Sequence, residues 1–471
     1  MKKVLKTIGI VLIVFVCYVV VGAIVPFVRQ REITDETAES FDAQSIYQGK
    51  ETKERAAVIS DNEKALEERI RLIAQAEDRI VLSTFEFDAD ESGKDMLAAL
   101  LAAADRGVQV SILADGMPAV LSMRGNPYFY ALAEAENVEI KLYNPVNPLL
   151  PWKLMGRLHD KYLIADRTAY ILGGRNTYDF FLGKGTGHIN YDWDVLVYCK
   201  GTEDASLDEL EAYYEQVWNQ EDCKPFGGST PLLKRRKTEQ ASDELRERYA
   251  TMQKEHGDWF TACDYEEMTR PTRGVYLMTN PTEVYAKEPV VYYEMTTLMQ
   301  SAEKEVRFHT PYILCDDWML EQLSDICSRT ESVVMMTNSV ANNGNPFGAM
   351  DYAAHKEEIL ETGVRILEYD GGVSYHGKCF TIDDNLVGVG SFNWDMRSAY
   401  LDTEMMVVIN SEELNADMKK EMGRYEESAL QVVDAETSLA PEGTVPREVS
   451  AKKAVTLRLL RIFGGWARFL M

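Results

Sequence analysis

The chain has 471 residues, of which 46% are hydrophobic and 27% are charged, and its formal net charge is −26. This length is too great for one ordinary domain, so we expect two core-forming domains with additional segments. The negative charge argues against nucleic acid as a partner, because binding to a polyanion depends largely on cationic contacts, although a local basic cleft would be an exception. The 7 cysteines show neither metal-ligand spacing nor a disulfide framework, which excludes the common zinc-binding and disulfide-rich classes.

The N-terminus carries a long apolar segment. Several lysines among the first six residues precede an uncharged run from Thr7 to Val28. As a helix this run would be roughly 33 Å long, enough to cross the core of a bilayer. We therefore expect residues 1–31 to form a single transmembrane anchor in the cell membrane, with a cleaved signal peptide as the alternative. The lysines favour an extracytoplasmic body, whereas the free cysteines favour the opposite side.

Residues 32–60 are polar and acidic, and we expect them to form a tether. The region 61–233 then alternates helix and strand patterns, with helices from Asn62 and over 96–104, and strands at 80–85 and 108–113. The region 276–432 repeats this order, with helices at 292–302 and 318–327 and strands at 306–308 and 333–336. The predicted fold class is α/β, with two tandem domains that each contain a mixed, mostly parallel sheet flanked by helices.

Two further segments lie outside these domains. Residues 234–275 predict a polar helical linker, whose basic start at Lys234 to Lys237 is typical of a solvated helix. Residues 433–471 form a tail, and its last part, 451–471, predicts an amphipathic helix with Arg461 and Arg468 opposite the apolar side. That helix suits insertion at an anionic bilayer surface, and packing on the body is the alternative. Its apolar side consists of Val455, Leu459, Ile462, Phe463, Trp466, Phe469 and Leu470.

One stretch of the chain occurs twice with identical spacing. The first copy reads HDKYLIADRTAYILGGRN, with His159, Lys161, Asp166, Gly173 and Asn176 at fixed intervals. The second copy reads HGKCFTIDDNLVGVGSFN, with His376, Lys378, Asp383, Gly390 and Asn393 at the same intervals. Such repetition over a whole motif indicates an internal duplication.

Each copy predicts a β-hairpin that turns at its aspartate. The strand period of two places His159 and Lys161 on one face, and the return strand brings Asn176 back beside His159. The same holds for His376, Lys378 and Asn393 in the second copy. Asp166 and Asp383 are expected to be structural, bonding amides of their turns. The glycines before each asparagine would let a substrate approach the backbone closely.

This set of side chains suits chemistry at phosphorus. One imidazole can form a covalent phosphohistidine, while the other protonates the leaving alcohol and later deprotonates the incoming one. Lysine and asparagine can hold the phosphoryl oxygens without a metal, so we expect neither a metal nor another cofactor. The segment FLGKGTGHIN, which includes His188, is expected to be a mobile loop beside the site. We expect structural roles for His256, His309 and His355.

The duplicated pattern H-x-K-x4-D-x6-G-[GS]-x-N resembles the phospholipase D superfamily. The stretches SGKDMLAALLAAADRGVQVSILADG, VEIKLYNP and YDWDVLV in the first half are similar to bacterial cardiolipin synthases, as are TNSVANN, ETGVRILEYDGG and GSFNWDMRSAYLDTE in the second. The resemblance implies two domains related by a pseudo-twofold axis around one shared site. It also implies that Asp194 and Glu404, which follow the hairpins, hydrogen-bond the catalytic histidines and fix their tautomers.

The same resemblance implies an activity. A phosphatidyl group would be transferred from one phosphatidylglycerol, an anionic phospholipid of the membrane, to the glycerol hydroxyl of another. By this resemblance His159 is the nucleophile and His376 the acid and base, an assignment that the residues themselves leave open. Hydrolysis of phospholipid, or less readily of nucleic acid, by the same residues is the alternative function.

Overall fold

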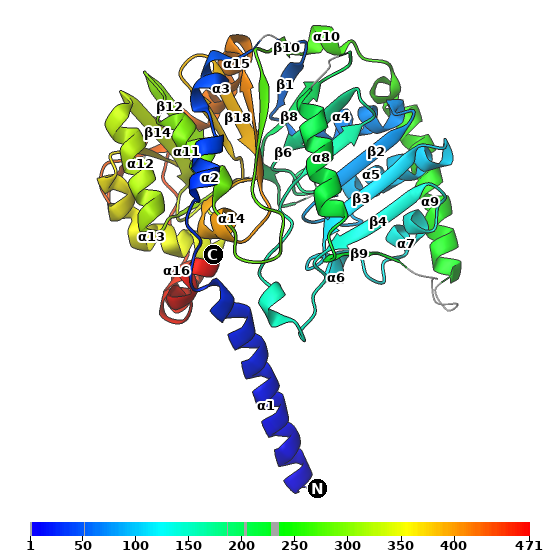
Figure 1. Ribbon diagram of the computed structural model, residues 1–471, viewed down its shortest axis with the longest axis horizontal. Helices are drawn as coiled ribbons and strands as arrows, with labels where there is room; N and C mark the ends of the chain where they lie inside the picture. Colours follow the sequence, from blue (N-terminus) through cyan, green and yellow to red (C-terminus); the bar gives the residue numbers. More distant parts are fainter. Residues whose placement is uncertain (1, 51, 186, 202–204, 228–234) are drawn as a thin grey trace.

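The computed structural model describes residues 2–50, 52–185, 187–201, 205–227 and 235–471. The body consists of two α/β halves that lie side by side, and helix α1 (Lys2–Ile24) projects from one end of it (Figure 1). Each half is built on a 9-stranded sheet with helices packed against it. The predicted α/β fold class, with two similar domains and an apolar N-terminal helix, is confirmed.

The first sheet has the strand order β10-β1-β8-β6-β5-β2-β3-β4-β9. Its strands are β1 (Arg55–Ile59), β2 (Arg79–Thr84), β3 (Gln109–Asp115), β4 (Val138–Tyr143), β5 (Tyr162–Ala165), β6 (Ala169–Gly173), β8 (Asp194–Tyr198), β9 (Cys223–Pro225) and β10 (Arg270–Pro271). The helices of this half are α4 (Asn62–Gln75), α5 (Glu91–Asp105), α6 (Ala119–Ser122), α7 (Pro127–Ala133), α8 (Ser206–Trp218), α9 (Arg235–Glu255) and α10 (Tyr265–Met268).

The second sheet has the order β11-β20-β18-β17-β12-β14-β15-β21-β22. Its strands are β11 (Val275–Thr279), β12 (Glu305–His309), β14 (Ser332–Asn338), β15 (Arg365–Tyr369), β17 (Cys379–Ile382), β18 (Leu386–Gly390), β20 (Met405–Asn410), β21 (Leu430–Val432) and β22 (Ser438–Leu439). The helices of this half are α11 (Val290–Met299), α12 (Asp317–Arg329), α13 (Pro346–Glu361), α14 (Met396–Tyr400) and α15 (Glu412–Glu426).

The sheets are mixed, but the expectation that they are mostly parallel is wrong. Parallel pairing is confined to β2-β3-β4 in the first sheet and β12-β14-β15 in the second. The motif hairpins and the strands beyond them add antiparallel pairs on one side of each sheet. Helices α5 and α12 connect parallel strands, as a crossover must. The strands of a hairpin are joined directly and pair antiparallel, so the parallel part is only a fraction of each sheet.

Alternation along the strands gives each sheet two buried faces. Ile80 and Leu82 of β2 pack in the cluster under α4 and α5, whereas Val81 lies in a cluster that also contains residues of the second half. In β14, Met335 packs in the cluster beneath the helices of the second half, and Met336 lies in the shared cluster. Side chains point alternately to opposite faces of a strand, so the two halves are joined through a common apolar core.

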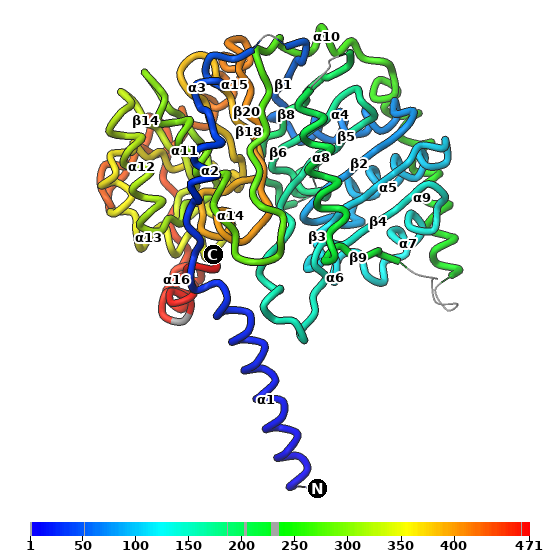
Figure 2. Tube along the Cα trace, viewed as in Figure 1, coloured from blue at the N-terminus to red at the C-terminus, as the bar shows by residue number. Residues whose placement is uncertain are grey.

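Residues 32–60 do not form the expected tether. They fold into α2 (Asp35–Ser40), α3 (Ala43–Gln48) and β1, and the N-terminal trace runs along the second half before β1 enters the first sheet (Figure 2). Ala43 and Ile46 are buried in the core of the second half, and the Tyr47 hydroxyl hydrogen-bonds Asp383. Apolar residues spaced through this polar segment explain why it packs on the body.

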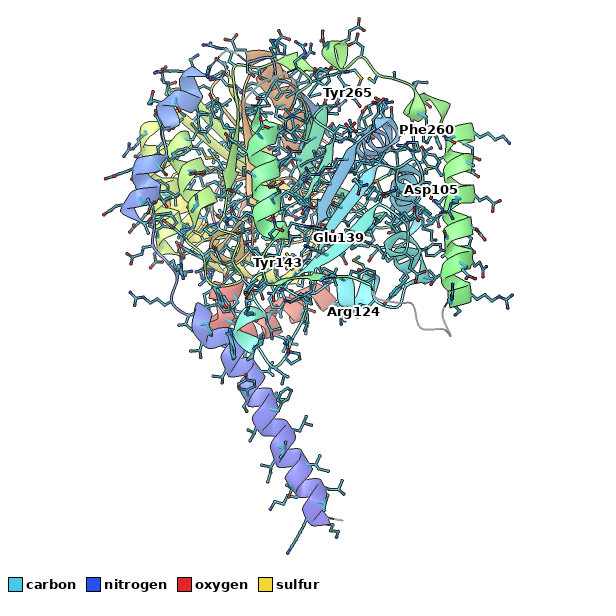
Figure 3. All side chains as sticks on the ribbon, turned by 45° about the vertical axis from the view of Figure 1, so that its right-hand side comes forward. Asp105, Arg124, Glu139, Tyr143, Phe260 and Tyr265 are labelled. Carbon is cyan, nitrogen blue, oxygen red and sulfur yellow. The ribbon has the colours of Figure 1, made fainter. Side chains whose placement is uncertain are left out.

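The predicted helical linker belongs to the first half. Helix α9 packs against α5 and α7 through its buried Leu245 and Met252. Its Arg246 pairs with Asp105 at the end of α5, Nε to Oδ2 2.8 Å, and Figure 3 shows Asp105 beside this helix. Lys234 lies outside the described residues, and Arg235 is exposed, in agreement with a solvated helix start.

The C-terminal segment packs on the second half at its end. Helix α16 (Ala451–Gly464) is followed by a 3-10 helix (Gly465–Leu470). Arg468 pairs with Asp351, Nε to Oδ1 2.7 Å, and the backbone amide of Arg397 donates to the Met471 carbonyl at 2.8 Å. Phe469 and Leu470 pack against the core, whereas Leu459 and Ile462 remain exposed. Helix α16 also packs against α13, and Lys453 Nζ donates to the Asn343 carbonyl at 2.7 Å. The alternative of packing on the body therefore applies to one side of α16 as well as to the last residues, and the side chain of Phe463 is not among those that the structure describes.

Candidate active site

The duplicated motif forms the two predicted hairpins. Strands β5 and β6 pair antiparallel, as do β17 and β18. His159 and Lys161 directly precede β5, and His376 and Lys378 directly precede β17. Each pair is therefore held at the end of a buried strand near the middle of its sheet.

Two short parallel contacts cross between the halves at this point. Leu158 bridges to Thr403, and β16 (Ser374–Tyr375) pairs with β7 (Asn190–Tyr191), with Tyr375 opposite Tyr191. In each contact the residue before a motif histidine faces the residue before an acidic side chain of the other half. The contacts therefore set each histidine beside a carboxylate from the opposite domain.

His159 pairs with Glu404 of the second half. Its Nδ1 lies 2.8 Å from Oε1 of Glu404, which also accepts from the Ser398 hydroxyl at 2.6 Å. Burial raises the pKa of the Glu404 carboxyl to about 8, although the charge of Lys161 opposes this shift. Burial, followed by the charge of Lys161, holds the pKa of the His159 imidazole well below its usual value. The pair is therefore poised as a neutral imidazole beside a carboxyl that retains its proton near neutral pH.

His376 pairs with Asp192 of the first half. Its Nδ1 lies 2.6 Å from Oδ2 of Asp192. Burial alone would raise the pKa of the Asp192 carboxyl, but the charges of Lys378 and His376 outweigh burial and lower it to about 2. Burial and Lys378 lower the pKa of His376 to about 4, against the attraction of Asp192. Asp192 is therefore a permanent anion that can stabilise a proton on His376 when the charge of Lys378 is neutralised by substrate.

Asp194 is not the partner of a histidine. Its carboxylate is fully buried and accepts from Arg69 Nη1 at 2.9 Å and from Arg175 Nη1 at 3.1 Å. The expectation that Asp194 bonds a catalytic histidine is therefore wrong, and the strand register explains why. Gly173 faces Asp194 in the first sheet, whereas the matching Gly390 faces Met406 in the second, so Asp194 corresponds to Met406. Glu404 therefore corresponds to Asp192, two residues before Asp194.

The two glycines of the first motif copy make room for buried carboxylates rather than for a substrate. A Cβ atom added at Gly173 would lie 2.2 Å from Asp194 Oδ1, and one added at Gly174 would lie 2.3 Å from Asp192 Oδ1. Such distances are far inside van der Waals contact, so any larger residue would displace the buried acids.

Lys161 and Lys378 are buried beside their histidines. Lys161 Nζ donates to the His159 carbonyl at 2.5 Å, and Lys378 Nζ lies 3.7 Å from Asp192 Oδ2. Burial lowers the pKa of the Lys161 ammonium to about 7 despite the attraction of Glu404, and burial likewise lowers the pKa of Lys378. A phosphoryl anion bound between them would favour their charged forms. Among the described residues, no group of three His, Cys, Asp or Glu side chains is arranged to hold a metal ion.

Both motif asparagines face one cavity of about 520 Å³, which both histidines also line. Asn176 and Asn393 are buried, and in the described part of the chain their Oδ1 atoms have no hydrogen-bond partner. Amide oxygens left unpaired at the wall of a cavity can accept hydrogen bonds from a substrate. The structure thus brings together the predicted His159, Lys161, Asn176, His376, Lys378, Asn393 and Glu404, and excludes Asp194.

Asp166 and Asp383 lie away from the cavity, at the hairpin turns. Asp166 accepts from the amides of Glu77, Asp78 and Arg79 at 2.9, 2.9 and 2.8 Å. Asp383 accepts from Glu303, Lys304 and Glu305 at 2.9, 2.8 and 2.9 Å. These amides belong to the segments that enter β2 and β12, not to the turns themselves. Each aspartate therefore fastens its hairpin to the neighbouring central strand.

Several residues of the site were not anticipated from the sequence. Phe85 packs edge-on against His159 with ring centroids 5.4 Å apart, and Phe181 packs in the same way against His376 at 5.0 Å. Arg157 and Arg397 line the cavity, and Arg397 Nε pairs with Asp402 Oδ2 at 3.0 Å. One sequence signal could have identified Phe85, which is an aromatic residue directly after strand β2.

The remaining histidines lie mostly outside the site. His188 lines the rim of the cavity next to Phe180. His309 is buried between Glu426 and Tyr375, with Nε2 2.8 Å from Glu426 Oε1. His355 contacts the Asp351 carbonyl, and His256 stacks on Trp259. His256, His309 and His355 therefore contact other protein groups and do not line the cavity.

Comparisons with known proteins identify the family of this chain. The family model described as "Cardiolipin synthase, PLD-like domain" matches residues 70–218 and 295–425, together more than half of the chain. Cardiolipin synthase C of Escherichia coli is 26% identical over 74% of this chain and 79% of that protein. Cardiolipin synthase 1 of Staphylococcus epidermidis is 24% identical over 77% of this chain and 66% of that protein. The crystal structure of a phosphatidylserine synthase from Haemophilus influenzae shares the fold, with a TM-score of 0.64, 14% identity, and coverage of 93% of this chain and 100% of that one.

Proposed function

Since the chain belongs to the cardiolipin synthase family with PLD-like domains, we propose that it transfers a phosphatidyl group between two phosphatidylglycerol molecules to make cardiolipin and glycerol. The observation that carries this proposal is the pair of motif histidines in one cavity, each bonded to a carboxylate of the opposite half. Phospholipid-modifying chemistry of the phospholipase D superfamily is the broader class to which the family match assigns it.

In the first step Nε2 of His159 attacks the phosphorus of one phosphatidylglycerol. The bond from phosphorus to the headgroup glycerol oxygen breaks, and protonated His376 gives its proton to that oxygen, so glycerol leaves. The phosphatidyl group remains on His159 as a phosphoramidate. Lys161 and Lys378 neutralise the charge on the phosphoryl oxygens, and the amides of Asn176 and Asn393 orient them.

In the second step the glycerol hydroxyl of another phosphatidylglycerol enters the cavity. His376 takes the proton of that hydroxyl, the oxygen attacks phosphorus, and the bond to Nε2 of His159 breaks. Cardiolipin forms, and His159 returns to its neutral state. Water in place of the second lipid would give phosphatidic acid instead, so the account requires the acceptor lipid to exclude water from the cavity.

The unequal acids support this division of roles. Asp192 stays ionised, with its pKa lowered to about 2 by the neighbouring cations against the effect of burial, so it favours an imidazolium on His376. Glu404, with its pKa raised to about 8 by burial, leaves His159 neutral, as a nucleophile must be. In both pairs Nδ1 faces the acid, which leaves Nε2 of His159 for phosphorus.

Helix α1 provides the proposed attachment to the cell membrane. Within the segment Lys2–Phe27, an 18-residue apolar window has a mean hydropathy of 3.1 and is only 6% buried, so most of its side chains have no protein core to pack in. A single span would keep the body at the surface where phosphatidylglycerol is found. We propose that the body lies on the extracytoplasmic side, because the lysines before the span favour a cytoplasmic N-terminus.

Product analysis tests the proposed function. The full-length protein is reconstituted in vesicles that contain phosphatidylglycerol with a deuterated headgroup glycerol, and the lipids are identified by mass spectrometry. We expect cardiolipin and free deuterated glycerol in equal amounts. Phosphatidic acid as the main product would mean that the enzyme is a hydrolase, and no change in the lipids would contradict both activities.

A further inference from the structure

The segment between β4 and the first motif histidine is apolar and projects from the body. Its sequence from Pro145 to Trp152 is PVNPLLPW, which contains no charged residue. Leu149 is 66% exposed, and the neighbouring Val146, Leu150 and Trp152 are exposed as well. Figure 1 shows this segment, coloured between cyan and green, extending from the body beside α1. Several neighbouring apolar side chains exposed on one segment are typical of a surface that contacts a membrane or another molecule.

The segment contacts the proposed membrane helix directly. The Tyr18 hydroxyl of α1 donates to the Leu149 carbonyl at 2.9 Å. Gly22 of α1 lies against Pro151, so closely that a Cβ atom on Gly22 would be 2.4 Å from Pro151 Cγ. The glycine thus allows the helix and the segment to touch along more than one helical turn.

The position of these contacts along α1 fixes the depth of the segment. Tyr18 precedes the end of α1 at Ile24 by about 9 Å along the helix axis, because an α-helix rises 1.5 Å per residue. The chain then continues as a 3-10 helix (Val25–Phe27), and the Phe27 side chain is buried in the core of the second half. The apolar part of α1 from Thr7 to Ile24, about 27 Å long, is no longer than the roughly 30 Å of hydrocarbon that it would cross. The helix can therefore shift little along the bilayer normal. If it spans the bilayer, Leu149, which contacts it at Tyr18, lies below the lipid headgroups.

The backbone of the segment is adapted to such an environment. Residues at positions 145, 148 and 151 are prolines, which have no backbone N–H to satisfy. The amide of Leu149 donates to Asn147 Oδ1 at 3.0 Å, and the amide of Leu150 donates to the Asn147 carbonyl at 3.0 Å. Irregular backbone is tolerated in hydrocarbon only where its polar groups have partners, and these contacts supply them for the most exposed residues.

We propose that residues 145–152 form a bilayer-inserted loop that packs on α1 and leads phospholipid from the membrane into the active site. Lys153 follows the loop and pairs with Asp222, Nζ to Oδ1 2.8 Å, a polar pair suited to the level of the headgroups. Met155 and Arg157, the next residues toward His159, line the catalytic cavity. A lipid beside the loop would therefore need to move only its headgroup to reach the histidine. This inference rests on the proposed membrane crossing of α1.

The test measures the depth of the loop without using activity. Cys17, Cys263 and Cys327 are replaced by serine, because the other cysteines are buried, and single cysteines are introduced by Leu149→Cys, Val14→Cys and Met268→Cys. Each is labelled with an environment-sensitive fluorophore in the full-length protein, which is then reconstituted in phosphatidylglycerol and phosphatidylcholine vesicles. Met268 is a matched control, since it is an exposed apolar residue on α10, at the opposite end of the body from α1 (Figure 1).

We expect the probe at position 149 to be quenched by lipids with spin labels on their acyl chains, with blue-shifted emission, as the probe at position 14 is. The probe at position 268 should respond only to an aqueous quencher. Quenching at position 14 without quenching at position 149 would overturn the loop proposal while leaving the anchor in place. Failure at both positions would overturn the membrane crossing and the loop together, and neither result depends on which lipid the enzyme makes.

Discussion

Nδ1 of His376 lies 2.6 Å from Oδ2 of Asp192, although the two residues belong to different halves of the chain. The other motif histidine repeats this exchange, because His159 pairs with Glu404 of the second half at 2.8 Å. Neither half therefore supplies both the histidine and the acid of a motif pair. The duplication has produced one site that depends on the interface, in which each domain supplies the imidazole of one pair and the carboxylate of the other.

The corrected partner of His376 gives a first prediction. Asp192→Asn removes the anion that stabilises the proton on His376, so we expect turnover to fall by about 10²- to 10⁴-fold. Steady-state transfer assays in phosphatidylglycerol vesicles, with thermal unfolding as a check on folding, measure this change.

Asp194→Asn is the matched variant, two residues away. It leaves the buried Arg69 and Arg175 without their shared carboxylate, and breaking a buried ion pair costs about 3–5 kcal/mol of unfolding free energy. Its main effect should be on stability, with smaller loss of turnover per folded molecule. The reverse pattern, with turnover lost in Asp194→Asn and retained in Asp192→Asn, would contradict the assignment.

A second prediction concerns pH. Burial raises the pKa of Glu404 from 4.5 to about 8, so between these values the folded protein keeps a proton that the unfolded chain has released. The contribution of Glu404 to stability is complete below its unfolded pKa and is lost as the pH rises toward 8, by about 1.4 kcal/mol per pH unit.

Glu404→Gln removes this titration. Between pH 5 and 7 the decline of unfolding free energy with pH should be less steep in the variant than in the wild type, whatever its absolute stability. Urea unfolding in detergent at several pH values measures the slope. Equal slopes in both proteins would mean that the Glu404 carboxyl is ionised in the folded state.

Much of the fold was predictable from local patterns. The helix and strand order of both domains follows from apolar periodicity and from capping residues such as Asp61 and Asp316, which accept from the amides of Lys64 and Met319. The folding of residues 32–60 could not be predicted, because their few apolar residues are buried only by contact with the second half, which is distant in sequence. The two motif hairpins are antiparallel and were predicted, but the antiparallel strands beyond them were not, since pairing between strands distant in sequence is not a local property.

The part of the site that could be predicted consists of the residues that recur at the same spacing in both copies of the motif. The repeated motif predicted its histidines and asparagines, which line one cavity, and its lysines, which are buried beside the histidines. Spacing failed for the acid, because Asp192 and Asp194 are two residues apart and strand alternation does not separate them. The longer connection after Asn176 than after Asn393 also hides the correspondence of Asp192 with Glu404. Only the register, in which Gly173 faces Asp194 and Gly390 faces Met406, decides between the two.

The C-terminal segment gives a third prediction. Arg468→Ala leaves Asp351 buried without its partner, so we expect the unfolding free energy to fall by about 1–3 kcal/mol. Arg461→Ala, on the same segment and exposed, serves as the control and should have little effect. Thermal unfolding of the full-length protein in detergent measures both changes. An unaltered midpoint for Arg468→Ala would show that the segment does not hold to the body in solution.

The fourth prediction concerns orientation. A cysteine introduced by Glu39→Cys lies on an exposed position of α2, close to the end of the proposed span. With the native accessible cysteines replaced by serine, it should react with a membrane-impermeant thiol reagent in intact cells, because the lysines before the span favour a cytoplasmic N-terminus. Labelling that occurs only after lysis would place the body in the cytoplasm.

The covalent intermediate is the central claim of the mechanism. His159→Ala removes the proposed nucleophile and His376→Ala removes the proposed proton carrier, so we expect both variants to lose the proposed transfer activity and to retain the wild-type unfolding midpoint. Loss of activity alone does not separate the two roles, because either change stops both steps.

The most direct measurement is to stop the wild-type enzyme during turnover on phosphatidylglycerol with an alkaline denaturant, in which a phosphoramidate survives, and to analyse its peptides by mass spectrometry. We expect the peptide with His159 to carry the added phosphatidyl mass and the peptide with His376 to be unmodified. Modification of His376 instead would reverse the two roles. An enzyme that turns over with neither histidine modified would contradict the two-step mechanism.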